Sequence, residues 1–190
     1  MEVQLINPEK KSFIPTSKIL LWLAIASMVM LFAGLTSAYV VRQAEGNWTY
    51  FEIPKPFFIS TVIIIISSFF MQWAVFAARK NQGANLKISL ITTLGLGLAF
   101  IFTQFVGWNM LVNEGVFFVG NPSGSFVYVI SGLHLAHLAG GIIYLLYVIT
   151  RAIQDRINSG NFLSVQLAAT YWHFLGGLWI YLFVFLSVIR

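Results

Sequence analysis

Five long apolar stretches, each free of Asp, Glu, Lys and Arg, constrain this chain more than any other feature of its sequence. They run over residues 19–41, 57–78, 88–112, 126–150 and 165–189. The hydrocarbon core of a bilayer is about 30 Å thick, and a helix needs about 20 apolar residues to cross it. A segment inside that core must satisfy its own backbone hydrogen bonds. The sequence therefore predicts an all-α, polytopic membrane protein with five transmembrane helices.

Composition agrees with this prediction and excludes several kinds of site. Hydrophobic residues make up 58% of the 190 residues and charged residues only 9%, well outside the range of soluble domains. Cysteine is absent, which excludes disulfides, thiolate metal ligands and a cysteine nucleophile. No loop between the spans is long enough to fold by itself. Residues 1–190 are therefore expected to form a single five-helix membrane domain, one bundle.

The basic residues divide unequally between the two sides of the membrane. Eight lie on the side of the N-terminal tail: Lys10, Lys11, Lys18, Arg79, Lys80, Lys87, Arg151 and Arg156. Only Arg42, Lys55 and Arg190 lie on the other side. Lysine and arginine favour cytoplasmic loops, so the N-terminus is predicted to be cytoplasmic and the C-terminus outside. The net charge of +5 is thus explained by topology, and no nucleic-acid partner is predicted.

Small residues recur every fourth position in two of the spans. Helices in lipid associate through close backbone approach, which small side chains permit. The rows are Gly95, Ala99, Thr103 and Gly107 in the third span and Gly132, Ala136 and Gly140 in the fourth. They predict that the third and fourth helices pack tightly along these rows.

All three histidines, His134, His137 and His173, lie inside spans. Ionisable groups within a membrane are candidates for function, and imidazole is a common haem and metal ligand. The simpler interpretation is a neutral ring that hydrogen-bonds across the bundle. At 1.5 Å per residue, His137 and His173 lie at depths that neither require nor forbid a haem between them.

Three segments carry a resemblance to a known family. They are LWLAIASMVMLFAGLTSAYVV at 21–41, SGLHLAHLAGG at 131–141 and YWHFLGGLW at 171–179. The chain resembles subunit III of the haem-copper oxidases, the cytochrome c and quinol oxidases, in its short five-helix form. The last segment is the most specific.

The resemblance implies a supporting subunit of a respiratory terminal oxidase, without chemistry of its own. Haem and copper are then expected in the partner subunits I and II, with no cofactor in this chain. Membrane phospholipids are further expected partners, and the implied location is the bacterial cytoplasmic (inner) membrane. Seven residues are expected to form structural contacts with lipid or with neighbouring subunits: His134, His137, His173, Trp172, Gly132, Ala136 and Gly140.

Three positions depart from the family pattern. The chain has Met28 where the first helix of the family usually has glutamate, Gly107 where glutamate is common, and Gly176 where the closing motif continues with aspartate. The absence of these three acids argues against proton transfer through carboxylates of this chain and favours a scaffold role.

Other functions remain as alternatives at this point. A haem b membrane anchor of a dehydrogenase is the main rival, and an accessory subunit of a nitric oxide reductase has the same helix pattern. An intramembrane serine hydrolase is disfavoured because Ser123 lies in a loop and lacks a Gly-x-Ser-x-Gly motif. A transporter is disfavoured because the spans are unbroken and show no inverted repeat.

Overall fold

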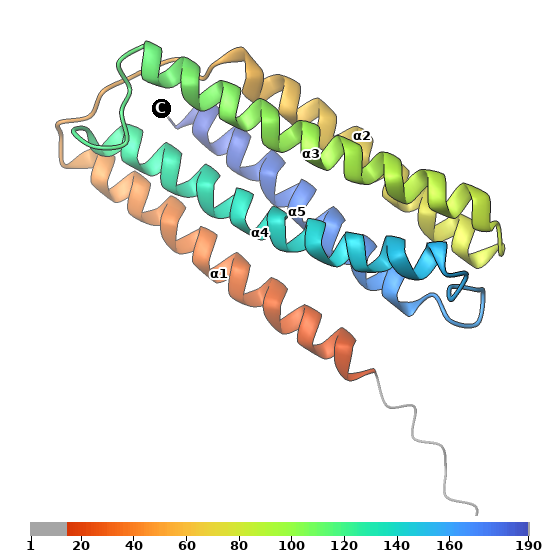
Figure 1. Cartoon of the computed structure of the whole chain (residues 1–190). Helices are drawn as coiled ribbons and strands as arrows, with labels where there is room; N and C mark the ends of the chain where they lie inside the picture. The colour runs from red at the N-terminus through yellow and green to blue at the C-terminus, as the bar shows by residue number, and fades with distance from the viewer. Residues whose placement is uncertain (1–14, 190) are drawn as a thin grey trace, which may run out of the picture.

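The computed structural model describes residues 15–189 of the chain, which fold into five α-helices (Figure 1). The helices are α1 (Thr16–Ala44), α2 (Lys55–Arg79), α3 (Gly83–Asn113), α4 (Pro122–Ile153) and α5 (Leu163–Val188). All five are long and apolar enough to cross a membrane. In the described part of the chain, β-pairing is limited to one isolated bridge between Asn158 and Asn161. The predicted all-α, five-span fold is confirmed.

The helices are longer than the apolar spans from which they were predicted. Each predicted span lies within its helix, except that Ile189 follows the last residue of α5. Helices α3 and α4 have 31 and 32 residues, which at 1.5 Å per residue is about 47 Å. Both helices are therefore longer than a hydrocarbon core of about 30 Å is thick.

Local sequence explains where α2 and α4 begin. Pro54 immediately precedes α2 and Pro56 lies in its first turn, where the missing N–H of proline costs no helical hydrogen bond. Asn121 precedes α4, and its side-chain oxygen accepts a hydrogen bond from the Ser123 N–H at 2.9 Å. Such a cap satisfies one of the free N–H groups of the first helical turn.

The helices pack as a bundle in which α1 has the least contact. Helices α2 and α3 form a closely packed antiparallel pair, α5 packs against α2 and α4, and α4 also packs against α3. Helix α1 lies at one edge beside α4 and touches only α4 and α5 (Figure 1). It buries one narrow row of side chains: Ile25, Met28, Phe32, Thr36 and Tyr39.

The C-terminal half of α1 carries its most specific contacts. The Tyr39 ring meets the rings of Trp48, Phe126 and Phe185 edge-on, with centroids 4.7, 5.6 and 5.2 Å away. The Thr36 and Tyr181 hydroxyls lie 3.2 Å apart, within hydrogen-bond distance. The aromatic cluster therefore anchors α1 to α4 and α5 near its C-terminal end.

The small-residue rows form only part of the contacts that their spacing predicted. Helices α3 and α4 pack together and Gly132 lies beside Trp108 of α3, but Gly107 packs on Phe57 of α2. In α3, Gly95 is exposed with nothing within 4 Å of an added Cβ atom, whereas Gly97 is buried against Trp172. In α4, Gly141 packs against Tyr171. A four-residue spacing identifies a helix face but not its neighbour, because a small side chain is equally tolerated against lipid.

Candidate functional site

Two indole groups of α5 are hydrogen-bonded to hydroxyl groups of α2. Trp172 Nε1 donates to Ser67 Oγ at 3.0 Å, and Trp179 Nε1 donates to Thr61 Oγ1 at 3.0 Å. The two tryptophans lie seven residues apart on one face of α5, and both are buried. Indole N–H groups in an apolar interior need acceptors. These bonds fix the rotation and the register of α5 relative to α2.

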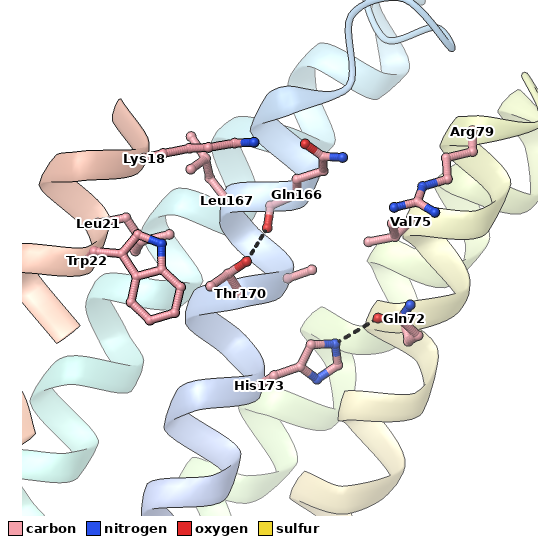
Figure 2. A pocket seen from close by; sticks show the side chains of 11 residues that line it. Lys18, Leu21, Trp22, Gln72, Val75, Arg79, Gln166, Leu167, Thr170 and His173 are labelled. Atoms are coloured by element: carbon pink, nitrogen blue, oxygen red, sulfur yellow. Dashed lines mark hydrogen bonds between the residues drawn. The ribbon is translucent and has the colours of Figure 1, made fainter. Parts of the chain in front are cut away.

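His173 makes the third contact between these two helices. Its Nε2 lies 3.1 Å from Gln72 Oε1, and its Nδ1 is hydrogen-bonded to Ser68 Oγ. Because Gln72 Oε1 can only accept, Nε2 carries the hydrogen and Nδ1 accepts from the serine hydroxyl. Both ring nitrogens are therefore occupied within the bundle (Figure 2 shows the bond to Gln72).

His134 lies fully buried in the centre of the bundle. Its ring packs against Trp179, Phe100 and Phe32, with centroids 5.1, 5.8 and 6.5 Å away. Among the described residues, neither ring nitrogen has a hydrogen-bond partner. The surroundings of His134 are three aromatic rings contributed by three other helices, so its position is set by packing.

His137 lies one turn further along α4 and is half-buried. Its Nδ1 donates to the Leu133 carbonyl of the same helix at 2.7 Å, and its ring meets Phe32 of α1 at 5.8 Å between centroids. The Tyr171 hydroxyl donates to the His137 backbone carbonyl at 3.0 Å. His137 thus belongs to the junction of α1, α4 and α5.

The three histidines point to different neighbours. His173 is bonded to α2, whereas His137 contacts α1, so the structure does not bring these two together as facing ligands. Within residues 15–189, no group of three or more His, Cys, Asp or Glu side chains could hold a metal ion. The histidines can hold helices together. Both ring nitrogens of His173 already do so, because each is bonded to a residue of α2.

The small residues singled out on α4 lie toward the outside of the chain. Ala136 and Gly140 are exposed, and Gly132 is partly buried with an added Cβ atom 4.0 Å from Trp108. Ala136 and Gly140 therefore lie on a face of α4 that the described part of the chain leaves exposed, whereas Gly132 lies beside α3.

The acceptors on α2 were not singled out from the sequence. Ser60 and Thr61 stand seven residues before Ser67 and Ser68, so the two pairs lie on one helix face. Gln104 of α3 extends the network by donating its Nε2 hydrogen to Ser60 Oγ at 2.8 Å. The acceptors Thr61 and Ser67 lie six residues apart and the two tryptophans seven, about two helical turns in each case. This similar spacing is the signal that could have paired α2 with α5.

Known proteins give the next line of evidence. The sequence profile of one family, described as cytochrome c oxidase subunit III, matches residues 13–189. The chain belongs to the cytochrome c oxidase subunit III family. A probable cytochrome c oxidase subunit 3 of Nocardia farcinica is 31% identical over 180 residues, covering 90% of this chain and 86% of its own.

Relatives with two different names occur in this subunit III family. The cytochrome c oxidase subunit 3 of Bacillus sp. strain PS3 is 25% identical over 167 residues, covering 85% of this chain and 80% of its own. A probable quinol oxidase subunit 3 of Staphylococcus saprophyticus is 26% identical over 173 residues, covering 88% of this chain and 86% of its own. The chain is a subunit III of a terminal oxidase.

Apolar side chains adjoin Met28, Gly107 and Gly176, the three positions at which the resemblance implied acids. Met28 is buried in the contact row of α1. The Phe57 ring lies over Gly107, where an added Cβ atom would come within 2.7 Å of it. Gly176 faces Ile64, whose Cγ1 would lie 3.7 Å from such an atom. Each position is therefore inside the bundle, and apolar side chains occupy the adjoining space.

Proposed function

We propose that this chain supports the oxidase as a non-redox structural subunit, and that its intramembrane polar groups hold helices in place. The observation that carries the proposal is the set of bonds from α5 to α2, in which two indoles and an imidazole are bound to hydroxyl and amide groups. Side chains that are bonded between two helices in this way hold the bundle together.

The proposal assigns the redox chemistry to partner subunits. Subunits I and II of the oxidase would carry haem and copper, and this chain would bind them and membrane phospholipids through its exposed faces. The exposed small residues Ala136 and Gly140 on α4 suit close approach by another helix or by lipid. The proposal covers both electron donors, cytochrome c and quinol, that the names of the relatives mention.

The proposed orientation has the N-terminus in the cytoplasm and the C-terminus outside, in the bacterial cytoplasmic membrane. At the end of the bundle where α1 begins, the described residues include six cations: Lys18, Arg79, Lys80, Lys87, Arg151 and Arg156. The opposite end has Arg42 and Lys55 with three glutamates. This asymmetry supports a cytoplasmic location for the first end.

Substitution of the histidines tests the proposed role. We expect oxidase complexes carrying His134→Leu or His173→Gln to keep the haem spectrum and the copper content of the unaltered complex, per mole of complex. The His173 variant is expected to lower the yield, because Ser68 and Gln72 lose a partner. Loss of a haem band in either variant would instead favour the haem b anchor. Turnover assays of the same preparations address the other alternative. Reduction of nitric oxide in place of oxygen would identify the complex as a nitric oxide reductase.

A further inference from the structure

The loop between α3 and α4 carries an exposed apolar segment, at the end of the bundle opposite the start of α1 (Figure 1). Residues 115–119, Gly-Val-Phe-Phe-Val, have no charged or polar side chain. Phe117, Phe118 and Val119 are 56%, 55% and 78% exposed. We call residues 115–119 the apolar hook. Neighbouring exposed apolar side chains of this kind mark a contact with another molecule or with a membrane.

Two glycines produce the turns at the ends of the apolar hook. Gly115 has a φ of +81° and Gly120 a φ of +118°, a range that glycine adopts without steric cost. The Val116 N–H donates to the Leu111 carbonyl at 2.9 Å, and the Gly115 N–H donates to the Val112 carbonyl at 3.0 Å. This pair of bonds closes α3 with a Schellman motif, so the chain turns sharply as it leaves the helix.

The backbone of the apolar hook is held against the start of α4. The Ser125 hydroxyl donates to the Phe118 carbonyl at 2.6 Å. Gly124 permits this approach, because an added Cβ atom would lie 2.6 Å from the Phe117 carbonyl oxygen. The Phe118 ring also meets the Tyr128 ring edge-on, with centroids 6.2 Å apart. The hook is therefore a fixed part of the fold that presents its apolar side chains outward.

Hydrogen bonds also show how far along the bundle the apolar hook lies. The Tyr128 hydroxyl is 2.9 Å from the Val116 carbonyl oxygen and 3.4 Å from the Trp108 carbonyl oxygen. Trp108 is five residues before the end of α3, and Ser125 is the fourth residue of α4. The hook therefore folds back against the last turns of α3 and the first turn of α4.

The lengths of α3 and α4 relate this position to the membrane. The two helices have 31 and 32 residues, and at an average tilt of about 20° they span about 44 Å along the membrane normal. A bilayer with its headgroups is about 40–45 Å thick. The ends of α3 and α4 would then lie in the headgroup layer, and side chains of the apolar hook would reach the edge of the hydrocarbon core.

The side chains around the apolar hook suit this boundary. Tyr50, of the loop between α1 and α2, is 69% exposed and lines a pocket of about 270 Å³ together with Phe117, Val119 and Glu114. Trp108 lies at the same end of the bundle and is partly buried. Tryptophan and tyrosine are enriched where a membrane meets water. Aromatic, apolar and carboxylate groups thus occur together here, as at an interface that is apolar on one side and wet on the other.

We infer that the apolar hook is a membrane-interface anchor, which inserts Phe117 and Val119 between the headgroups and the acyl chains of the adjacent leaflet. Its partner is the lipid surface itself, and no particular headgroup is required. The anchor fixes the depth of this end of the bundle, because the hook is bonded to α4 and closes α3. The inference goes beyond the proposed scaffold role and does not depend on it, since it needs only the five membrane spans.

Spin labelling of the intact oxidase complex tests the anchor. This chain has no cysteine, so Phe117→Cys and Val119→Cys each introduce one labelling site in this subunit. The labelled complexes would be placed in phosphatidylcholine vesicles, and the unaltered complex, treated in parallel, gives the signal from partner subunits. The collision rates of each label with oxygen, which concentrates in hydrocarbon, and with a water-soluble nickel chelate would then be measured.

Two reference positions bracket the expected depth. Glu52 is exposed in the loop between α1 and α2, so a label at Glu52→Cys should report water. Phe102 is 69% exposed on α3 and lies 11 residues, or about 17 Å, before the end of that helix, so a label at Phe102→Cys should report the membrane interior. We expect the ratio of oxygen to nickel collision rates at Phe117→Cys and Val119→Cys to lie between the two references.

Two results would overturn the inference. If the ratio at both hook positions equalled that of Glu52→Cys, the apolar hook would lie in water. If both labels were immobilised and collided rarely with either reagent, a partner subunit would cover the hook. All four substituted side chains are exposed, and the bonds that hold the hook involve its backbone, so the variants are expected to keep the fold.

Discussion

Replacement of Gly97 by leucine is expected to abolish most recovery of the assembled oxidase. An added Cβ atom at this position would lie 2.8 Å from Cη2 and 3.1 Å from Cζ2 of Trp172, and the remaining atoms of leucine would reach further. Trp172 cannot move freely, because its indole is buried and bonded to Ser67. Overpacking of this kind costs about 1–3 kcal/mol, and loss of the Ser67 bond adds about 0.6 kcal/mol.

Gly95 supplies the matched control for this experiment. It lies two residues away on the same helix, is exposed, and has nothing within 4 Å of an added Cβ atom. Gly95→Leu should therefore assemble as the unaltered chain does, measured by the amount of this chain that copurifies with subunit I. Equal recovery of the two variants would contradict the close contact between Gly97 and Trp172 described above.

Replacement of Met28 by glutamate is expected to have the second large effect. Met28 is 5% exposed and lies 12 residues, or about 18 Å, from the start of α1. The residues beside it in the contact row, Ile25 and Phe32, are apolar. A carboxyl group near the centre of a membrane helix costs about 2.5–3.5 kcal/mol, so α1 should pack poorly and the yield of complex should fall.

Met28→Leu separates the effect of the acid from that of the changed shape. Exchange of methionine for leucine usually costs under about 1.5 kcal/mol, so this variant should assemble well. Copurification with subunit I is again the measurement. If the glutamate variant assembled as well as the leucine variant, its carboxyl would have to be hydrated or paired, and the description of this position as apolar would be wrong.

The number of helices was predictable because it depends on a local property. An uncharged apolar run of about 20 residues can only cross the bilayer as a helix, and this holds for each span whatever its neighbours are. The ends were less predictable, since α3 and α4 continue through polar residues beyond their apolar spans.

The buried face of each helix depends on neighbours that the sequence does not name. Gly95 and Gly97 look alike in sequence, and only the position of Trp172 leaves too little space for a side chain at the second. The bond from Trp172 to Ser67 spans 105 residues, so it requires the register of α2 and α5. Lipid is as apolar as leucine, so hydrophobicity alone does not distinguish a face packed on protein from one facing the membrane.

The neighbours of the histidines were also not evident from the sequence. Their positions inside spans were evident, but the choice between ligand and contact depended on what each ring faces. Gln72 and Ser68 meet His173, and aromatic rings surround His134. These partners belong to other helices, so the spacing of residues within α4 or α5 alone does not identify them.

Haem and metal analysis of the separated subunit tests the central claim most directly. The chain would be released from the purified oxidase with detergent, isolated, and measured for Soret absorbance, iron and copper, with the remaining complex measured in parallel. We expect no stoichiometric haem, iron or copper in the isolated chain and the full amounts in the remaining complex. One haem or one metal ion per isolated chain would contradict the account of a structural subunit.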